Sequence, residues 1–196
     1  MQKALIILFI LFICRFSISC CRDADYNYKW ANINIQNLSF NINDTSVLLV
    51  DSIKASHYGF QSLFKHEKVA FLNMKNLGIN SAFALSCHAN AILKDSVISI
   101  TITTKNDYNH IHFSGDDITH YFLARPVPNG FTGTDFNFKP VKDYISHLNT
   151  EDALGYNRMQ FKLEDTTANL GSHVFYLNLR MKSGIVLSDS TFIRFY

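Results

Sequence analysis

The sequence predicts an all-β fold, an immunoglobulin-like β-sandwich with one short helix near residues 140–148. The chain is rich in Phe, Tyr, Ile, Val and Thr and has only three Pro, a composition that suits pleated, half-buried strands. Many short runs alternate between apolar and polar residues, which is the period of a strand with one buried face. The chain ends in two such runs joined by Lys182-Ser183-Gly184, where glycine suits a hairpin turn. The order of the strands is not evident from the sequence.

The first 19 residues stand apart from this fold. Lys3 precedes an unbroken apolar run from Ala4 to Cys14, which is shorter than the roughly 20 residues of a membrane span. A basic start, a short apolar core and small residues after it predict a signal peptide over residues 1–19. Ser19-Cys20 resembles the cleavage region of a bacterial lipoprotein signal, in which a small residue precedes the cysteine that receives the lipid. We therefore expect Cys20 to be the lipidated first residue; the alternative is ordinary cleavage near Ser19, which would release a soluble protein.

The rest of the chain is expected to hold a lipid-anchored tether, residues 20–28, and a single β-sandwich domain, residues 29–196. Without the leader the chain has 16 basic and 16 acidic residues, so it lacks the basic excess that a nucleic-acid-binding protein normally shows. Cys21 and Cys87 are then the two thiols left for an oxidising compartment. Either they form a disulfide, or Cys87 is a small buried side chain and Cys21 is a free thiol.

Within the domain, residues 97–104 give the clearest strand, with Ile98, Ile100 and Ile102 on its apolar face. Gly59 is expected to mark a bulge or a close approach of two chain segments. The other expected strands cover residues 30–36, 47–50, 58–64, 69–72, 159–163, 174–181, 185–187 and 191–195, with an interruption near Ser188-Asp189 between the last two.

The long connection and the helix are predicted from proline and glycine. Residues 125–133 contain two prolines and two glycines and are expected to form a long loop. Pro140 suits the first position of a helix. The four apolar residues after it fall on one face at helical spacing, which predicts the short helix. They are Val141, Tyr144, Ile145 and Leu148.

Several stretches of the chain, taken in order, resemble a known family. They are Cys20-Cys21 followed by residues 26–30, then residues 53–60, 82–88, 97–108 and 112–122, and the hairpin of residues 171–193. The resemblance is to a family of small uncharacterised lipoproteins from Bacteroides-type bacteria, a domain of unknown function. It implies a lipoprotein of the cell envelope, and it carries over no activity and no catalytic residue.

His110-Ile111-His112 is the first candidate for chemistry. Residues two apart on a strand share a face, so both imidazoles could meet one metal ion, with His120 as a further ligand. The pattern has no second pair at fixed spacing, so we expect two histidines at a strand end and no metal site. The nearby aspartates, Asp107, Asp116 and Asp117, are expected to cap turns. The motifs of common hydrolases and nucleotide-binding proteins are absent from the sequence.

The expected function is that of a non-enzymatic cell-envelope lipoprotein that serves binding or assembly and needs no cofactor. Its expected partners are the membrane, through the lipid on Cys20, and an unknown protein or glycan; the expected location is the outer membrane. Tyr26, Tyr28 and Trp30 lie close to the anchor and are expected to be the most exposed rings. The alternative is a small metal-dependent hydrolase that uses His110, His112 and His120.

Overall fold

The computed structural model describes residues 26–41, 44–47, 51–69, 91–127, 137–150, 154–155 and 157–196. Cys20, Cys21, Cys87, the predicted signal peptide and most of the strand predicted at residues 69–72 lie outside these residues, so the division into residues 1–19, 20–28 and 29–196 stays a prediction. The chain forms two compact units, residues 1–28 with 68–92 and residues 29–67 with 93–196. Most of the described residues belong to the second unit. No described helix is long and apolar enough to span a membrane.

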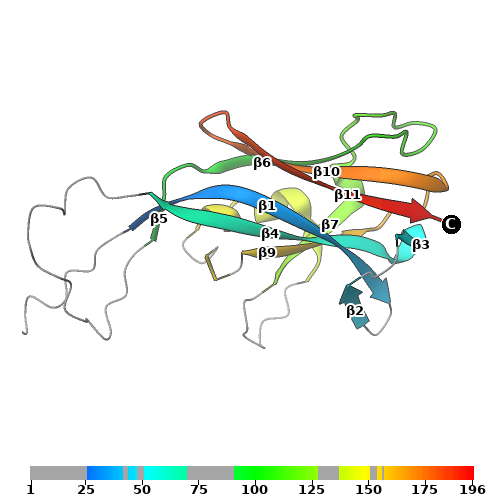
Figure 1. Ribbon diagram of the computed structural model, residues 1–196, viewed down its shortest axis with the longest axis horizontal. Helices are drawn as coiled ribbons and strands as arrows, with labels where there is room; N and C mark the ends of the chain where they lie inside the picture. Colours follow the sequence, from blue (N-terminus) through cyan, green and yellow to red (C-terminus); the bar gives the residue numbers. More distant parts are fainter. Residues whose placement is uncertain are drawn as a thin grey trace, which may run out of the picture. The chain divides into compact units, whose positions relative to one another are not determined.

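The predicted all-β sandwich is confirmed, and Figure 1 shows its two layers. The seven-stranded sheet has the order β2-β1-β4-β9-β7-β8, with β5 paired to β1 outside this path. These strands are β1 (Tyr26–Asn41), β2 (Asp44–Val47), β4 (Tyr58–Val69), β5 (Ala91–Leu93), β7 (Phe122–Val127), β8 (Lys139–Pro140) and β9 (Arg158–Leu163). The four-stranded sheet has the order β3-β11-β10-β6. Its strands are β3 (Ser52–Ile53), β6 (Val97–Thr104), β10 (Gly171–Met181) and β11 (Val186–Phe195).

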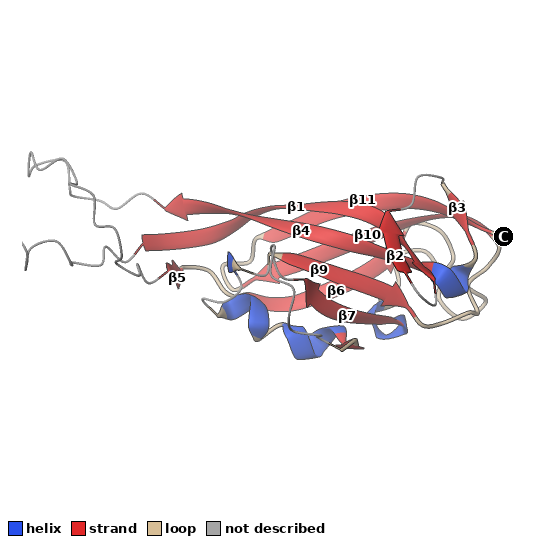
Figure 2. Cartoon of the chain, turned by 90° about the horizontal axis from the view of Figure 1, so that it is seen from below, coloured by secondary structure: helices blue, strands red, loops and turns tan. Residues whose placement is uncertain are grey.

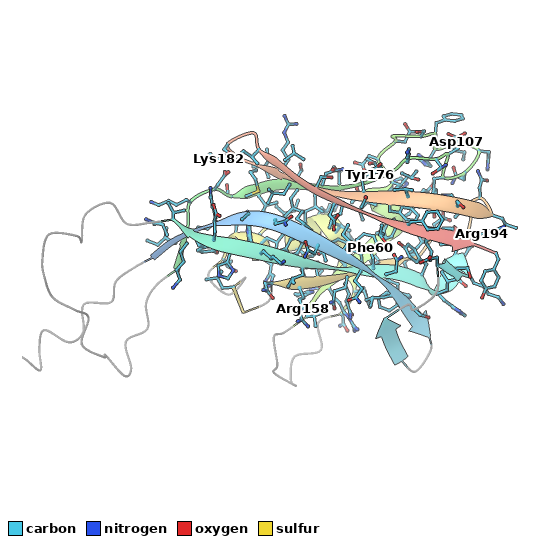
Figure 3. All side chains as sticks on the ribbon, viewed as in Figure 1. Phe60, Asp107, Arg158, Tyr176, Lys182 and Arg194 are labelled. Carbon is cyan, nitrogen blue, oxygen red and sulfur yellow. The ribbon has the colours of Figure 1, made fainter. Side chains whose placement is uncertain are left out.

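The core between the two sheets is built largely from aromatic rings. Tyr58, Phe60 and Phe64 project from alternating inward positions of β4 and are fully buried. The ring of Tyr58 stacks on that of Phe175 from the opposite sheet, with 5.4 Å between ring centroids. Figure 3 shows Phe60 between the layers. Each large buried ring contributes a substantial part of the hydrophobic stabilisation, and the offset and edge contacts between rings add to it.

The prediction that Tyr28 and Trp30 are exposed is wrong. Tyr28 has 0 % and Trp30 has 3 % of its surface exposed, because both lie at inward positions of β1. The indole N–H of Trp30 donates to the carbonyl of Leu148 at 3.3 Å, so the ring is buried without losing its hydrogen bond. The side chain of Tyr26 lies outside the described part of the chain.

The predicted strand at residues 97–104 is β6, but one of its three predicted inward residues points outward. Ser99 pairs with Arg180, and Val97 pairs with Met181. Ile98 is therefore the extra residue of a β-bulge, which reverses the alternation of side chains at that point. Ile98 is 52 % exposed, whereas Val97 is buried.

The first three residues of the loop predicted at residues 125–133 are part of a strand, and residues 128–133 lie outside the described part of the chain. Arg125, Pro126 and Val127 belong to β7, in which Phe122, Ala124 and Pro126 alternate as buried residues. Among the described residues β8 pairs only with Leu123 and Ala124, so β7 is an edge strand at Pro126. A proline, which has no N–H, is tolerated at such an edge.

The expected interruption near Ser188-Asp189 is also absent, because β11 pairs with β10 without a break over its whole length. The polar side chains at this point have partners beside the strand. The Ser188 hydroxyl donates to the Asn178 side chain at 2.6 Å, and the Asp189 carboxylate accepts the N–H of Ile35 at 2.7 Å. Polar residues inside a strand thus mark cross-strand contacts here, and they do not mark a turn.

The short helix near residues 140–148 is present as two turns of 3-10 helix, η3 (Val141–Tyr144) and η4 (His147–Asn149). Its backbone bonds join residues three apart, as in the N–H of Ile145 to the carbonyl of Lys142 at 3.3 Å. The other 3-10 turns are η1 (Ala55–His57) and η2 (Thr119–Tyr121). Figure 2 shows short helical turns along the side of the sandwich where β6 and β7 lie.

Candidate binding groove

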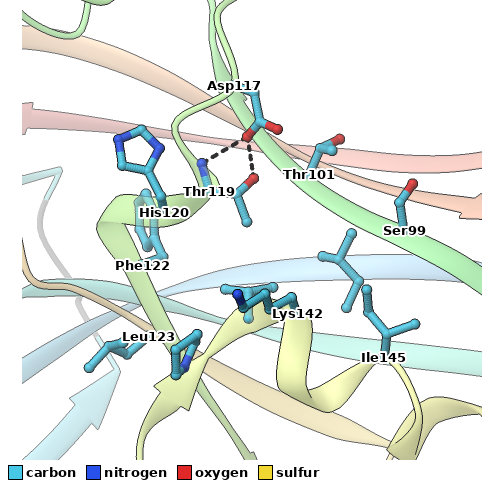
Figure 4. Close-up of a pocket in the computed structure, with 12 residues that line it drawn as sticks. Ser99, Thr101, Asp117, Thr119, His120, Phe122, Leu123, Lys142 and Ile145 are labelled. Carbon is cyan, nitrogen blue, oxygen red and sulfur yellow. Dashed lines mark hydrogen bonds between the residues drawn. The ribbon is translucent and has the colours of Figure 1, made fainter.

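A groove of about 640 Å³ opens between the two sheets on the side where β6 is the last strand. One wall is the edge of β6, and the other is formed by β7, the start of η3 and the residues that follow it. Figure 4 shows Ser99 and Thr101 on β6, with Lys142 and Ile145 across the opening. We call this the β6–η3 groove. It is lined by Ser99, Ile100, Thr101, Asp117, Thr119, His120, Phe122, Leu123, Pro140, Val141, Lys142 and Ile145.

The edge of β6 is covered at both ends. The N–H of Ile102 donates to the Thr119 hydroxyl at 2.7 Å, and its carbonyl accepts the N–H of Ile118 at 2.9 Å. At the other end, the side-chain amide of Asn149 accepts the N–H of Val97 at 2.8 Å and donates to its carbonyl at 2.9 Å. Asn149 therefore contacts Val97 as a neighbouring strand would, with one donor and one acceptor.

Between these covered ends, the peptide groups of Ile100 face the groove without a partner in the described chain. The N–H and C=O of Ile102 point away from β10 and bond to the residues before and at the start of η2. The Ile102–Leu177 pair therefore exchanges no backbone hydrogen bonds across the sheet. Antiparallel pairs alternate between the two kinds, so the Ile100–Leu179 pair is of the same kind. The N–H and C=O of Ile100 thus both point away from β10, toward the groove.

The opposite wall is mostly apolar and has one cation at its rim. Val141 is buried beneath the groove, Ile145 is half-buried, and the Lys142 side chain is exposed. This wall is held in place by Tyr144, whose hydroxyl donates to the carbonyl of Asn137 at 2.7 Å, and by Leu148, which is fully buried. No carboxylate of the described residues lies within ion-pair distance of Lys142.

The acidic side of the groove is part of the framework. The Asp117 carboxylate accepts the N–H of Thr119 at 2.9 Å and also the hydroxyl of Thr119, as the dashed lines in Figure 4 mark. The Thr119 hydroxyl in turn accepts the N–H of Ile102. This chain of hydrogen bonds fastens the loop to β6.

The structure brings two of the three candidate histidines together. The rings of His112 and His120 are 5.3 Å apart between centroids, and both contact the ring of Tyr121. The expected strand at residues 110–112 is wrong, because this segment is a loop. Asn109 is buried, and its side-chain oxygen accepts the N–H groups of Ile111 and His112 at 3.0 and 2.8 Å. Such side-chain bonds favour a turn over an extended strand.

The predicted role of the nearby aspartates in turns is confirmed. Asp116 accepts the N–H of Phe113 at 2.8 Å, and Asp107 accepts the N–H of Ser114 at 2.9 Å. Within the described residues no three His, Cys, Asp or Glu side chains gather where they could hold a metal ion. The expectation that His110, His112 and His120 form no metal site stays a prediction.

Tyr108 fixes this loop to the core. Its ring stacks on Tyr121 with 5.2 Å between centroids and meets His173 and Phe175 edge-on. Burial raises the pKa of the Tyr108 phenol, and the negative charge of Asp165 raises it further. The phenol therefore stays protonated and serves the packing of the loop.

Sequence reasoning missed the groove, although it singled out several of its residues. Val141 and Ile145 were recognised as the apolar face of a helix, and Ser99 and Thr101 as the wet face of a strand. What makes them one site is the position of β6 at the end of its sheet. Strand order was not evident from the sequence, so no local signal joined the two walls. Comparisons of the chain with protein-family models, with curated proteins and with solved structures give no match.

Proposed function

We propose that this protein is a non-enzymatic lipoprotein of the cell envelope that binds another macromolecule in the β6–η3 groove. The observation that supports this most directly is the groove itself. It is preformed, its inner wall is apolar, and it offers a few polar groups at defined positions. Ligand sites in proteins commonly have this size and this make-up.

The polar groups of the groove favour binding over catalysis. The Asp117 carboxylate accepts from Thr119, and the Thr119 hydroxyl accepts the N–H of Ile102 on β6, so both side chains serve to hold the loop on the strand. No described hydrogen bond pairs the His120 ring with a hydroxyl or a carboxylate, as an activated nucleophile would require.

The anchor in this proposal is the lipid on Cys20, in the outer membrane. The support is the sequence of the leader, Ser19-Cys20 behind a short apolar core. Each buried methylene group of an acyl chain contributes about 0.8 kcal/mol, so several chains hold a protein durably at a membrane. Cys20→Ala should move the full chain from the membrane fraction to the soluble fraction and abolish acyl labelling. Unchanged fractionation and labelling would contradict the anchor.

Binding in the groove is tested by photo-crosslinking in cells. A photoreactive residue replaces Lys142 at the groove rim or, as the matched control, Lys182 in the hairpin turn of the sandwich (Figure 3). We expect a discrete adduct from position 142 and none from position 182. No adduct from either position would contradict the binding function, and the same adduct from both would contradict the groove as its site.

The alternative, a small metal-dependent hydrolase with His110, His112 and His120 as ligands, has one observation in its favour: the contact between the rings of His112 and His120. We expect elemental analysis of the purified full chain to find no stoichiometric zinc. A chelator should leave the melting temperature of the double variant His110→Ala, His112→Ala unchanged, as it should for the parent. Stoichiometric zinc in the parent, lost in the double variant, would favour the hydrolase.

A further inference from the structure

We propose that the occupant of the β6–η3 groove is an extended, acidic peptide segment of a partner protein, which pairs its backbone with β6 at Ile100. This inference rests on the proposed binding function and names its ligand. Proteins that add a peptide strand to a free sheet edge obtain affinity from backbone bonds and specificity from alternating side-chain positions.

The first argument is the open edge. A sheet edge with free N–H and C=O groups invites pairing with another chain, and proteins usually cover it. Here Val97 is covered by Asn149, and Ile102 by Ile118 and Thr119. Ile100 lies between them with both groups directed into the groove. The uncovered stretch between these two residues, Ile98 to Thr101, is about 13 Å long at roughly 3.3 Å per residue, which admits a ligand strand of about three to five residues.

The short opening favours an antiparallel ligand strand. In an antiparallel pair a single ligand residue opposite Ile100 exchanges both hydrogen bonds with it. A parallel strand would instead bond to Ile100 through the two ligand residues on either side of that position, so it would need a longer ligand segment in the groove.

The side chains of the ligand follow from the same geometry. Residues directly opposite each other share one face of a sheet, and the Ile100 side chain is buried. The ligand residue opposite Ile100 therefore points inward, toward Val141 and Ile145, and should be apolar. Its two neighbours point outward, beside Ser99 and Thr101, and should be polar.

The charge of the ligand follows from Lys142. Its ammonium group stands at the rim with no carboxylate of the described chain in ion-pair contact. Asp117 lies on the β6 side and already accepts two hydrogen bonds from Thr119. A carboxylate on the ligand next to Lys142 completes the groove, whereas a sugar lacks both this charge and a strand's matched donor and acceptor.

The test uses a fluorescein-labelled, end-capped peptide of seven residues with one central valine, threonines beside it and one glutamate. Fluorescence anisotropy measures its binding to the full chain purified in detergent. The control peptide carries an N-methyl group on the central valine, which removes the donor to Ile100 C=O and places a methyl group against β6. We expect at least ten-fold weaker binding of the control, because a lost backbone bond also leaves a buried acceptor without a partner.

Two protein variants test the charge. Lys142→Glu should weaken binding about five-fold, since a surface attraction becomes a repulsion, while Lys182→Glu should leave it unchanged. Bound peptide should also slow hydrogen exchange in residues 97–104. Three results would overturn strand pairing by a partner. They are equal binding of both peptides, no binding at millimolar peptide, and concentration-dependent self-association of the parent that the peptide does not reverse. If position 142 gives a crosslinked adduct in cells but any of these results is found, the proposed binding function still holds and only the peptide ligand is refuted.

Discussion

Asn37 joins the two sheets at the edge opposite the groove, and its removal should destabilise the fold strongly. Its side-chain N–H donates to the carbonyl of Phe192 at 2.8 Å. Its side-chain oxygen accepts the hydroxyls of Tyr58 at 3.0 Å and Thr191 at 2.8 Å. Asn37→Ala removes all three bonds at once.

The size of the effect depends mainly on Tyr58, which is fully buried. In Asn37→Ala its hydroxyl has lost its partner, and an unsatisfied buried donor costs about 1–3 kcal/mol. The other two bonds are partly exposed and contribute about 0.5–1 kcal/mol each. The free energy of unfolding should therefore fall by about 2–5 kcal/mol. Tyr58→Phe removes the hydroxyl itself and should cost only about 1 kcal/mol, because Thr191 still satisfies the Asn37 oxygen.

A double-mutant cycle in urea checks this reasoning. The double variant Asn37→Ala, Tyr58→Phe should be more stable than the sum of the single effects predicts, by about 1–2 kcal/mol, because no orphaned hydroxyl remains. Gln36→Ala, an exposed neighbour on the same strand, is the control and should change stability by less than about 0.5 kcal/mol. Additive single effects, or a loss below about 1 kcal/mol in Asn37→Ala, would refute the network.

Two further predictions concern stability. Gly59→Ala should lower the free energy of unfolding in urea by about 3 kcal/mol or more, because a Cβ would lie 2.2 Å from both the Phe40 ring and the Phe161 carbonyl oxygen. The control, Gly184→Ala, has open space around a Cβ at a φ of 92° and should cost about 1 kcal/mol. Equal losses of stability in the two variants would contradict the close packing at Gly59. Burial raises the pKa of Tyr58, so its contribution to stability is complete below the unfolded-state value of about 10 and is lost as the pH rises above it. Above pH 10 the free energy of unfolding of the parent should fall by up to about 1.4 kcal/mol per pH unit more than that of Tyr58→Phe. Parallel pH profiles of stability for the two proteins would speak against a protonated phenol.

The fold class was predictable because alternation of side chains is a local signal that burial enforces. Phe175, Leu177 and Leu179 alternate in the sequence and are all buried in β10. The close approach at Gly59 was also predicted, and the contact with Phe40 confirms it. The errors fell where a contact distant in sequence decided the outcome. Trp30 is buried with its indole N–H bonded to the carbonyl of Leu148, far away in the sequence, and Ile98 is exposed because its strand bulges against β10.

The groove was less predictable than the fold because it depends on which strand ends a sheet. Asn149 and Val97 are far apart in the chain, and nothing in either neighbourhood indicates that one covers the other. The arrangement of the histidines was also not predictable from their spacing. Their spacing predicted a shared strand face, but Asn109 bends the segment into a loop. The rings of His112 and His120 are in contact because of this loop, and not because they share the face of a strand.

The bulge at Ile98 determines how wide the opening at Ile100 is. Without it, regular alternation would direct the N–H and C=O of Ile98 outward as well as those of Ile100, and a longer free edge would expose the protein to edge-to-edge pairing. The bulge turns Val97 so that its N–H and C=O meet the Asn149 side chain. The open edge is thereby centred on the N–H and C=O of a single residue, Ile100, which is flanked by Ser99 and Thr101 and faces an apolar wall. Such an opening is too short to seed the stacking of whole strands, yet it is long enough for a few residues of a ligand whose side chains suit the groove.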